Sequence, residues 1–313
     1  MSSHLIAVDL GGTNMRIALF DGENLTPSQA SRVPTHAKEG PDSVISRMIE
    51  AIEKLSPDGN SALRIGVGAP GPLDPRAGVV LEAPNLPGWV DIHLKERLKD
   101  HFDCPVAIGN DANLAALAEW KHGAGRGTDN LIYLTISTGV GGGVICDGHL
   151  LLGARGIAAE LGHITVVPGG PLCGCGQRGH LEAVASGPAI ARRAQALLDG
   201  GANSSLAEHN GELTATDVGH AAESGDVLAI QVFDEAAAYL GQAMANFAHL
   251  FNPQIFILGG GVAQVGPLLF DPTRAALDRQ IMDPSYLEGL RIEPAALGDD
   301  AGLIGAMTLA AEL

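Results

Sequence analysis

The sequence predicts an α/β protein made of two related domains. Its 313 residues are enough to build two domains, each with its own core. Short apolar runs typical of buried strands alternate with stretches of helical periodicity. A unit of strand, glycine turn and strand occurs twice, over residues 5–22 and 131–148. Such a repeat indicates an internal duplication.

The first unit consists of strands from Leu5 to Val8 and from Met15 to Phe20. The turn between them reads Asp9-Leu10-Gly11-Gly12-Thr13-Asn14. The backbone N–H groups of such a turn, including those of Gly11 and Gly12, can approach a phosphate, and Thr13 adds a hydroxyl donor. The Asp9 carboxylate is suited to Mg²⁺ or to its water shell. A plain hairpin turn is the alternative, and the pattern is not a P-loop, which needs Gly-Lys-Ser/Thr before a helix.

The second unit has a strand from Leu131 to Ile136, a glycine turn over Ser137–Gly143 and a strand from Val144 to Cys146. Thr138 and Gly139 are its candidate phosphate contacts. Two matching turns, one in each domain, predict that the domains hold the phosphates of one nucleotide between them.

The first domain continues with a core helix over Pro41–Leu55 and a buried strand over Leu63–Gly68. Two loops rich in proline and glycine follow, Ala69–Asp74, which contains Gly71, and Asn85–Trp89. Both fit structural turns, and both also fit the rim of a substrate site.

Asp111 follows a short strand, Pro105–Ile108, at the point where a helix reaching Gly123 begins. Ligands of open α/β sheets bind at such strand ends. Asp111 is therefore a candidate general base that accepts the proton of an attacking hydroxyl, with Asn110 bound to neighbouring hydroxyls. The alternative is that Asp111 only caps the helix N-terminus.

A four-ligand metal set occupies the middle of the chain. It consists of His163, Cys173, Cys175 and His180, and glycines separate the cysteines and follow them. Two thiolates and two imidazoles suit a tetrahedral, structural Zn²⁺ site, because four protein ligands leave no open position for catalysis. Glu160 and Glu182 flank the set and would be held for hydrogen bonds to a polar substrate such as a sugar. A coincidence of cysteines and ordinary histidines is the alternative.

The remaining chain predicts further helices and strands. The helices cover Ser186–Leu198, Asp226–Phe251 and Ala301–Ala311, and the strands cover Ile255–Leu258 and Arg291–Glu293. Three consecutive glycines, Gly259, Gly260 and Gly261, follow the strand Ile255–Leu258. They fit a surface for the adenosine part of a nucleotide, and they fit a tight strand-to-helix turn equally well.

Charge and apolar patterning restrict the partners. The 36 acidic side chains exceed the 19 basic ones, giving a formal charge of −17. This balance disfavours nucleic acid and anionic membrane surfaces, so a small-molecule partner is expected. No apolar run reaches the roughly 18 residues of a membrane helix, and no secretion signal starts the chain. A cytoplasmic location is therefore expected, where cysteines stay reduced and metal binding is favoured over disulfides.

These motifs, in this order, resemble the ROK family of repressors and sugar kinases, and the resemblance covers essentially the whole chain. The motifs that carry it are Asp9-Leu10-Gly11-Gly12-Thr13, Asn110-Asp111-Ala112-Asn113, Ser137-Thr138-Gly139-Val140-Gly141-Gly142-Gly143, Glu160-Leu161-Gly162-His163 and Cys173-Gly174-Cys175-Gly176 with Gly179 and Glu182. The resemblance implies an actin-like, ribonuclease-H-like ATPase fold of the hexokinase type. Two α/β domains, residues 1–112 plus 301–313 and residues 113–300, would close over a cleft.

The resemblance also implies a reaction, in which the γ-phosphoryl of Mg·ATP passes to the 6-hydroxyl of glucose. Asp111 would be the base, and Gly71, Asn110, Glu160, His163 and Glu182 would contact the sugar. ATP would lie against the residues of the glycine clusters: Asp9, Gly11, Gly12, Thr13, Thr138, Gly139, Gly259, Gly260 and Gly261. A homo-oligomer, a dimer or a tetramer, is expected.

Several alternatives stay open. N-acetylglucosamine, N-acetylmannosamine, mannose and fructose kinases share most of these residues, and polyphosphate could replace ATP as donor. A sugar-sensing repressor would carry an added helix-turn-helix before its first phosphate strand, which here starts at Leu5. The family's metal run ends in a third cysteine, and this chain has His180 there. Either His180 completes a Cys₂His₂ site or it does not bind the metal.

Overall fold

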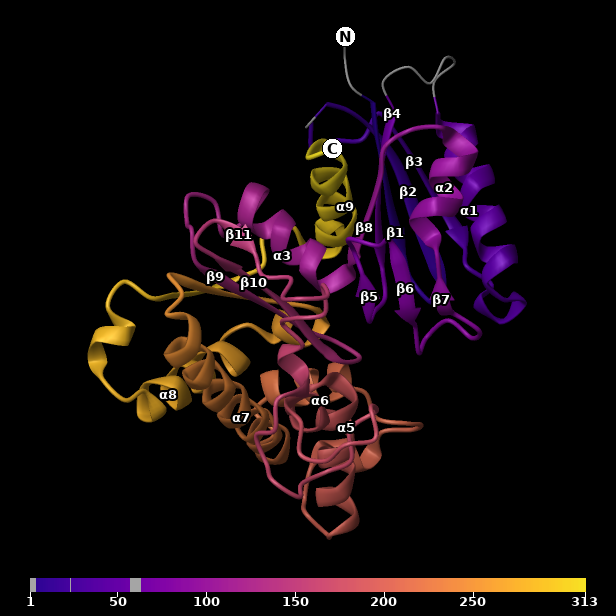
Figure 1. Ribbon diagram of the computed structural model, residues 1–313. Coiled ribbons are helices and arrows are strands. Elements are labelled where there is room, and N and C mark those ends of the chain that lie inside the picture. Colours follow the sequence, from indigo (N-terminus) through magenta and orange to yellow (C-terminus); the bar gives the residue numbers. More distant parts are fainter. Residues whose placement is uncertain (1–3, 23, 57–62) are drawn as a thin grey trace. The chain divides into compact units, whose positions relative to one another are not determined.

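A computed structural model describes residues 4–22, 24–56 and 63–313. Contacts within the chain divide it into two units. The first comprises residues 1–126, 150–159 and 299–313, and the second comprises residues 127–149 and 160–298. Each unit contains a five-stranded sheet and several helices, so each is α/β (Figure 1).

The first sheet has the strand order β3-β2-β1-β4-β8. Its strands are β1 (His4–Leu10), β2 (Asn14–Asp21), β3 (Gln29–Pro34), β4 (Leu63–Ala69) and β8 (Val106–Asn110). β1 runs antiparallel to β2 and parallel to β4, and β4 runs parallel to β8. A small sheet beside it contains β5 (Leu73–Asp74), β6 (Val79–Glu82) and β7 (Val90–Ile92).

The second sheet has the order β11-β10-β9-β12-β13. Its strands are β9 (Leu131–Ile136), β10 (Val140–Cys146), β11 (His149–Leu150), β12 (Ile255–Gly259) and β13 (Arg291–Pro294). β9 runs antiparallel to β10 and parallel to β12, and β12 runs parallel to β13. Because the four strands β2-β1-β4-β8 and β10-β9-β12-β13 share order and direction, the predicted duplication is confirmed.

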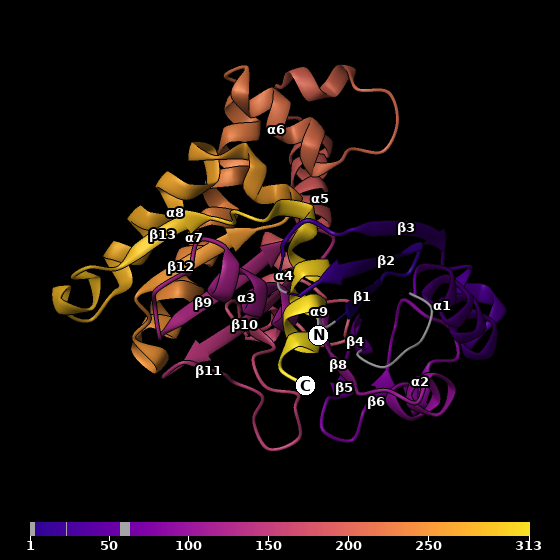
Figure 2. The ribbon, with the colours of Figure 1, turned by 90° about the horizontal axis from the view of Figure 1, so that it is seen from above.

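Helices lie on both faces of the first sheet. α1 (Pro41–Leu55) and α2 (Leu94–Phe102) lie on one face and α9 (Ala301–Ala311) on the other (Figures 1 and 2). The face under α1 forms the core, where β1 side chains such as Ile6 and Val8 meet Val44 and Met48 of the helix. Helical spacing of these apolar residues explains why α1 forms over the predicted range.

α3 (Asp111–His122) packs along α9. Gly305 allows this close approach, because a Cβ there would overlap the backbone of Leu114. α3 therefore belongs to the first unit, as do residues 150–159. The contact-based units thus differ from the predicted division, which placed a boundary after residue 112.

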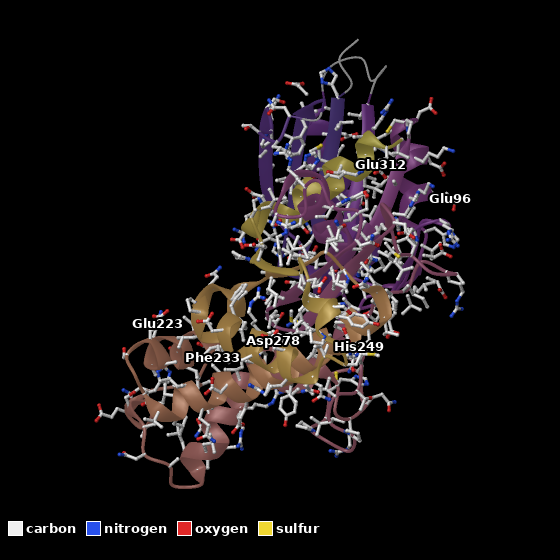
Figure 3. The ribbon with its side chains drawn as sticks, turned by 90° about the vertical axis from the view of Figure 1, so that its left-hand side faces the viewer. Glu96, Glu223, Phe233, His249, Asp278 and Glu312 are labelled. Atoms are coloured by element: carbon white, nitrogen blue, oxygen red, sulfur yellow. The ribbon has the colours of Figure 1, made fainter. Side chains whose placement is uncertain are left out.

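The second unit is rich in helices: α4 (Leu181–Ala185), α5 (Gly187–Asp199), α6 (Ala215–Glu223), α7 (Val227–Phe251) and α8 (Pro267–Gln280). α7 packs against the other four. Phe233 of α7 is buried, and Gly241 lets α8 approach because a Cβ there would lie 2.5 Å from Ala276. Figure 3 shows Phe233 on α7 and Asp278 on α8.

Single 3₁₀ turns complete the chain: η1 (Ala37–Glu39), η2 (Leu161–His163), η3 (Ser205–Glu208), η4 (Gly261–Val265), η5 (Pro284–Leu287) and η6 (Gly298–Asp300). Within the described part of the chain, every helix is too short or too polar to cross a bilayer.

Candidate active site

The carboxyl edge of the first sheet gathers one set of predicted site residues. Asp9 of β1 is in register with Gly68 of β4, and Ala69 of β4 is in register with Asn110 of β8. The turn after β1, the loop containing Gly71 and the start of α3 therefore emerge at the same edge. Parallel strands place their ligand sites there.

The first glycine turn is tightly braced. Its own backbone closes it, with the Gly11 N–H donating to the Asn14 carbonyl oxygen at 3.1 Å. The buried Thr35 adds two bonds, from Oγ1 to the Gly11 carbonyl oxygen at 2.6 Å and from its N–H to the Thr13 carbonyl oxygen at 2.8 Å. Arg47 in turn donates to the Thr35 carbonyl oxygen at 2.7 Å. No local pattern in the sequence identifies Thr35, because the residues that it binds are distant in the chain.

Asp9 is a carboxylate in a setting suited to a cation. Burial raises its pKa above the usual value, and the nearby Arg16 guanidinium partly offsets that rise. The carboxylate lies beside Gly302, where a Cβ would be 3.3 Å from either oxygen, at the first turn of α9. A helix N-terminus stabilises negative charge. A divalent cation with its water shell would favour the ionised form further.

Asn110, not Asp111, caps α3. The Asn110 Oδ1 atom accepts from the N–H groups of Ala112 at 3.0 Å and Asn113 at 3.2 Å. Asp111 is the first helical residue; it is exposed, and its Oδ1 accepts from the Ala112 N–H at 2.8 Å. The N-cap interpretation of Asp111 is therefore wrong, because the preceding residue has the extended backbone that a cap requires.

Capping leaves the other end of the Asn110 amide pointing to the loop that contains Gly71. A Cβ on Gly71 would lie 2.9 Å from Asn110 Nδ2, so only glycine leaves room for this group. The two predicted sugar contacts of the first unit are thus neighbours, and Nδ2 is a donor suited to a hydroxyl oxygen.

The second glycine turn is shorter than predicted. Residues from Val140 to Gly143 pair with β9 as part of β10, so the turn itself spans only Ser137–Gly139. The Ser137 N–H donates to the Gly139 carbonyl oxygen at 2.8 Å. The Val140 N–H donates to Glu182 Oε2 at 3.2 Å. The prediction was wrong for the glycines of β10, because strand pairing with β9 overrides their weak intrinsic preference for strands.

Glu160 and His163 lie on one short turn of the second unit. η2 begins after Glu160, and the His163 N–H donates to the Glu160 carbonyl oxygen at 3.1 Å. Gly162 lies directly against the Val140 carbonyl group, where any side chain would overlap it. This contact anchors η2 to β10, with Glu160 exposed and His163 half-buried.

The four predicted metal ligands come together. One donor atom from each of His163, Cys173, Cys175 and His180 lies within 4.8 Å of all the others. Cys173 Sγ is 3.7 Å from His163 Nδ1, and Cys175 Sγ is 3.3 Å from His180 Nδ1. Tetrahedral Zn–S and Zn–N bonds would separate such atoms by about 3.5 Å. The donor set therefore fits a Zn²⁺ ion after a small contraction, and His180 lies with the other three.

Cys173 connects this cluster to Glu182. Its thiol is 3.2 Å from Glu182 Oε1, and burial, with smaller contributions from its neighbours, raises its pKa to about 12. The raised pKa favours the protonated thiol. A coordinated metal reverses this preference and holds the sulfur as thiolate. Gly176 and Gly179 adopt positive φ, as the sequence suggested for a loop folded round an ion, whereas Gly174 does not.

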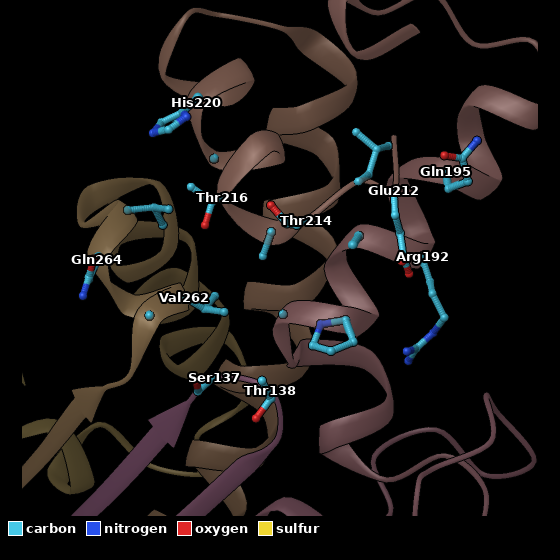
Figure 4. Close-up of a pocket in the computed structure, with 18 of the residues that line it drawn as sticks. Ser137, Thr138, Arg192, Gln195, Glu212, Thr214, Thr216, His220, Val262 and Gln264 are labelled. Carbon is cyan, nitrogen blue, oxygen red and sulfur yellow. The ribbon is translucent and has the colours of Figure 1, made fainter. Parts of the chain in front are cut away.

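A cavity of about 740 Å³ opens in the second unit beside the turn Ser137–Gly139. In Figure 4, Ser137 and Thr138 lie at the end of a strand, with Thr214, Thr216 and His220 on neighbouring helical segments. The wall comes from α5, α6, η4 and the loop before α6. Its polar and charged residues include Arg192, Gln195, Glu212, Thr214, Thr216, His220, Glu223 and Gln264.

Thr138 and Gly261 are the predicted nucleotide contacts that line this cavity. Gly139, Gly259 and Gly260 do not line it. Gly260 instead makes the tight turn from β12 into η4, with φ of 85° and no room for a Cβ beside Ile136. The tight-turn interpretation of the third glycine cluster is therefore confirmed at Gly260, and the adenosine surface stays a prediction.

The cavity wall formed by α5 and α6 was not predicted from the sequence. The one local signal was Thr214 with Asp217 three residues later. These residues form a capping box, which starts α6 at the cavity. The predicted residues thus form two sets. Asp9, Gly11, Gly12, Thr13, Gly71, Asn110 and Asp111 belong to the first unit, and the others belong to the second.

Comparison with known proteins identifies the family of this chain. The ROK family model matches residues 5–313. The chain belongs to the ROK family. The glucokinase of Thermotoga maritima is 39% identical over 311 residues, which cover 98% of this chain and 97% of that protein. The xylose repressor of Caldicellulosiruptor bescii is 31% identical over 310 residues, which cover 97% of this chain and 77% of the repressor.

The structural comparison agrees. The crystal structure of a ROK family glucokinase from Streptomyces griseus in complex with glucose and AMPPNP matches with a TM-score of 0.82 and 36% identity, covering 99% of this chain and 100% of that one. The fold of this ROK protein is the hexokinase-type, actin-like α/β fold, as the sequence resemblance implied.

Proposed function

We propose that this chain is an ATP-dependent glucokinase that phosphorylates glucose on its 6-hydroxyl group. The observation that carries the proposal is the full-length match to a ROK glucokinase crystallised with glucose and AMPPNP. The identity of the chain to the glucokinase of Thermotoga maritima supports the same activity.

Asp111 is the proposed general base. It lies at the carboxyl end of β8, is exposed, and is placed by the Asn110 cap at the start of α3. The glucose 6-hydroxyl oxygen attacks the γ-phosphorus, its proton passes to the Asp111 carboxylate, and the bond to the ADP oxygen breaks. Gly71, Asn110, Glu160, His163 and Glu182 are the proposed sugar contacts.

The proposed ATP contacts include residues from each unit. The nucleoside of ATP would occupy the cavity beside Thr138 and Gly261. The phosphates would meet the turns at Gly11–Thr13 and at Thr138–Gly139. Asp9 would hold Mg²⁺ through its water shell, and the ion would neutralise phosphate charge during transfer. The division of the chain into domains of residues 1–112 plus 301–313 and residues 113–300 stays a proposal.

Zinc is the proposed metal of the His163, Cys173, Cys175 and His180 cluster. With four protein ligands its role is structural. His163 would bind zinc through Nδ1, the nitrogen nearest Cys173 Sγ, and offer Nε2 to the sugar. The proposed location of the protein is the cytoplasm, and glycolysis is the proposed pathway that uses the phosphorylated sugar. The proposed oligomeric state is a dimer or a tetramer.

An ATP-consumption assay across glucose, mannose, fructose, N-acetylglucosamine and N-acetylmannosamine tests the substrate. Glucose should give the highest kcat/KM. If an acetylated sugar gives a higher value, that sugar replaces glucose as the proposed substrate. The donor is tested by exchanging ATP for polyphosphate.

A sugar-responsive regulator is the second candidate, because the chain is also related to a xylose repressor. The same assay separates the two candidates. A regulator would bind sugar without consuming ATP, whereas the proposed enzyme turns ATP over only when a hexose is present.

A further inference from the structure

Val140, the residue after the second glycine turn, is held from two sides. Its N–H donates to Glu182 Oε2 at 3.2 Å, and its carbonyl group lies against Gly162 of η2. Both contacts come from segments that carry proposed sugar ligands, Glu182 itself and the Glu160–His163 turn. The backbone next to the nucleotide turn is therefore part of the same packed structure as the sugar site of the second unit.

Glu182 reaches the turn only because Gly139 lacks a side chain. A Cβ on Gly139 would lie 2.5 Å from Glu182 Oε2. The other carboxylate oxygen, Oε1, is 3.2 Å from Cys173 Sγ. One half-buried carboxylate thus joins the metal segment to the turn that offers backbone N–H groups to phosphate.

The turn needs such support. Within Ser137–Gly139, the backbone bond from the Ser137 N–H to the Gly139 carbonyl oxygen closes only three residues. A hydrogen bond to a carboxylate is stronger than one between neutral groups, so the Glu182 contact restricts the peptide at Gly139 and Val140. Restricted N–H groups bind phosphate with less loss of conformational entropy.

We propose that Glu182 is a positioning residue for the nucleotide turn, in addition to its role as a sugar contact. This inference rests on the proposed function, because it assumes that the turn binds ATP phosphates. It has a specific consequence. Nucleotide affinity depends on Glu182 when no sugar is present, which a residue that only binds sugar would not produce.

The test is isothermal titration of AMPPNP with Mg²⁺ into the zinc-loaded full chain without sugar. Glu182→Ala should weaken AMPPNP binding about tenfold, the order expected for one hydrogen bond to a charged group. Glu182→Gln keeps a carbonyl oxygen that can accept from the Val140 N–H, so it should stay within about twofold to threefold of the unchanged protein.

Glu160→Ala is the matched control, because it removes a neighbouring proposed sugar contact that has no hydrogen bond to the turn among the described residues. It should weaken glucose binding and leave AMPPNP binding unchanged. Zinc content by mass spectrometry and melting temperature are measured for every variant, so that affinities are compared between folded, metal-loaded proteins.

Gly139→Ala provides a second route that keeps the carboxylate. Its Cβ should displace Glu182 and weaken AMPPNP binding, and it should add little in a Glu182→Ala background, since the two changes remove one contact. Equal AMPPNP affinity for the unchanged chain, Glu182→Ala and Gly139→Ala would overturn the inference and leave the proposed function intact. No AMPPNP binding by the unchanged chain would overturn both.

Discussion

The Thr35 hydroxyl donates to the Gly11 carbonyl oxygen at 2.6 Å, and the same residue binds the Thr13 carbonyl oxygen through its N–H. Thr35 lies just past the end of β3, an edge strand, and is completely buried. It thereby fixes a turn that begins more than twenty residues earlier. The conformation of the first candidate phosphate turn depends on this contact.

Thr35→Val should therefore loosen the turn without changing side-chain volume much. Loss of the hydroxyl leaves a carbonyl group without its donor, at a cost of about 1–2 kcal/mol in the free energy of unfolding. The KM for ATP should rise severalfold, while the KM for glucose should change little. Steady-state kinetics and urea denaturation measure these effects. Thr35→Ser, which keeps the hydroxyl, is the control, and an unchanged KM for ATP in Thr35→Val would contradict the prediction.

Asp111→Asn should remove turnover and keep sugar binding. The amide retains an oxygen that can accept from the Ala112 N–H, so the start of α3 should persist. Loss of a general base lowers kcat by about 10²- to 10⁴-fold. Calorimetric titration with glucose and the ATP-consumption assay measure the two properties separately. Loss of glucose binding together with activity would instead assign Asp111 a role in folding or binding.

Cys175→Ser should lower zinc content and weaken glucose binding together. The serine hydroxyl is a poor replacement for a thiolate ligand, and the segment that leads into α4 and Glu182 would lose its anchor. Metal content by mass spectrometry and glucose affinity are the measurements. Cys146→Ser is the matched control, since Cys146 is half-buried on β10 outside the cluster. Full zinc content in Cys175→Ser would remove this residue from the ligand set.

Asp226 should contribute a pH-dependent part of stability. Although burial raises its pKa, hydrogen bonds from the Ala229 N–H and from Ser205 and Ser204 outweigh that effect and lower the pKa to about 2. The stabilisation is present above the unfolded pKa, near 3.8, and is lost as pH falls through about 2.

Asp226→Asn measures this contribution. The difference in unfolding free energy from the unchanged chain should be about 1 kcal/mol at pH 6, because solvent screens this partly exposed site. It should shrink steadily between pH 4 and pH 2. Asp199→Asn, the same change on the exposed end of α5, is the matched control variant. A difference that stays constant across this range would refute the proposed linkage.

Local patterns in the sequence determined much of the secondary structure. Apolar periodicity placed α1 at Pro41–Leu55, β9 at Leu131–Ile136 and α9 at Ala301–Ala311 with the bounds that the structure has. These assignments succeed because the pattern of buried residues in each element depends only on the order of its own consecutive residues. The metal set was also readable, since its four ligands lie within eighteen residues of one another in the chain.

Tertiary structure decided the contacts between distant segments. Only the folded chain shows that Thr35 braces the first turn, that Glu182 binds the Val140 N–H, and that α5 and α6 wall the cavity. It also decided that the glycines after Gly139 form a strand, because pairing with β9 supplies hydrogen bonds that no local preference encodes. Sequence order specifies which groups exist, whereas long-range packing and hydrogen bonding specify which of them meet.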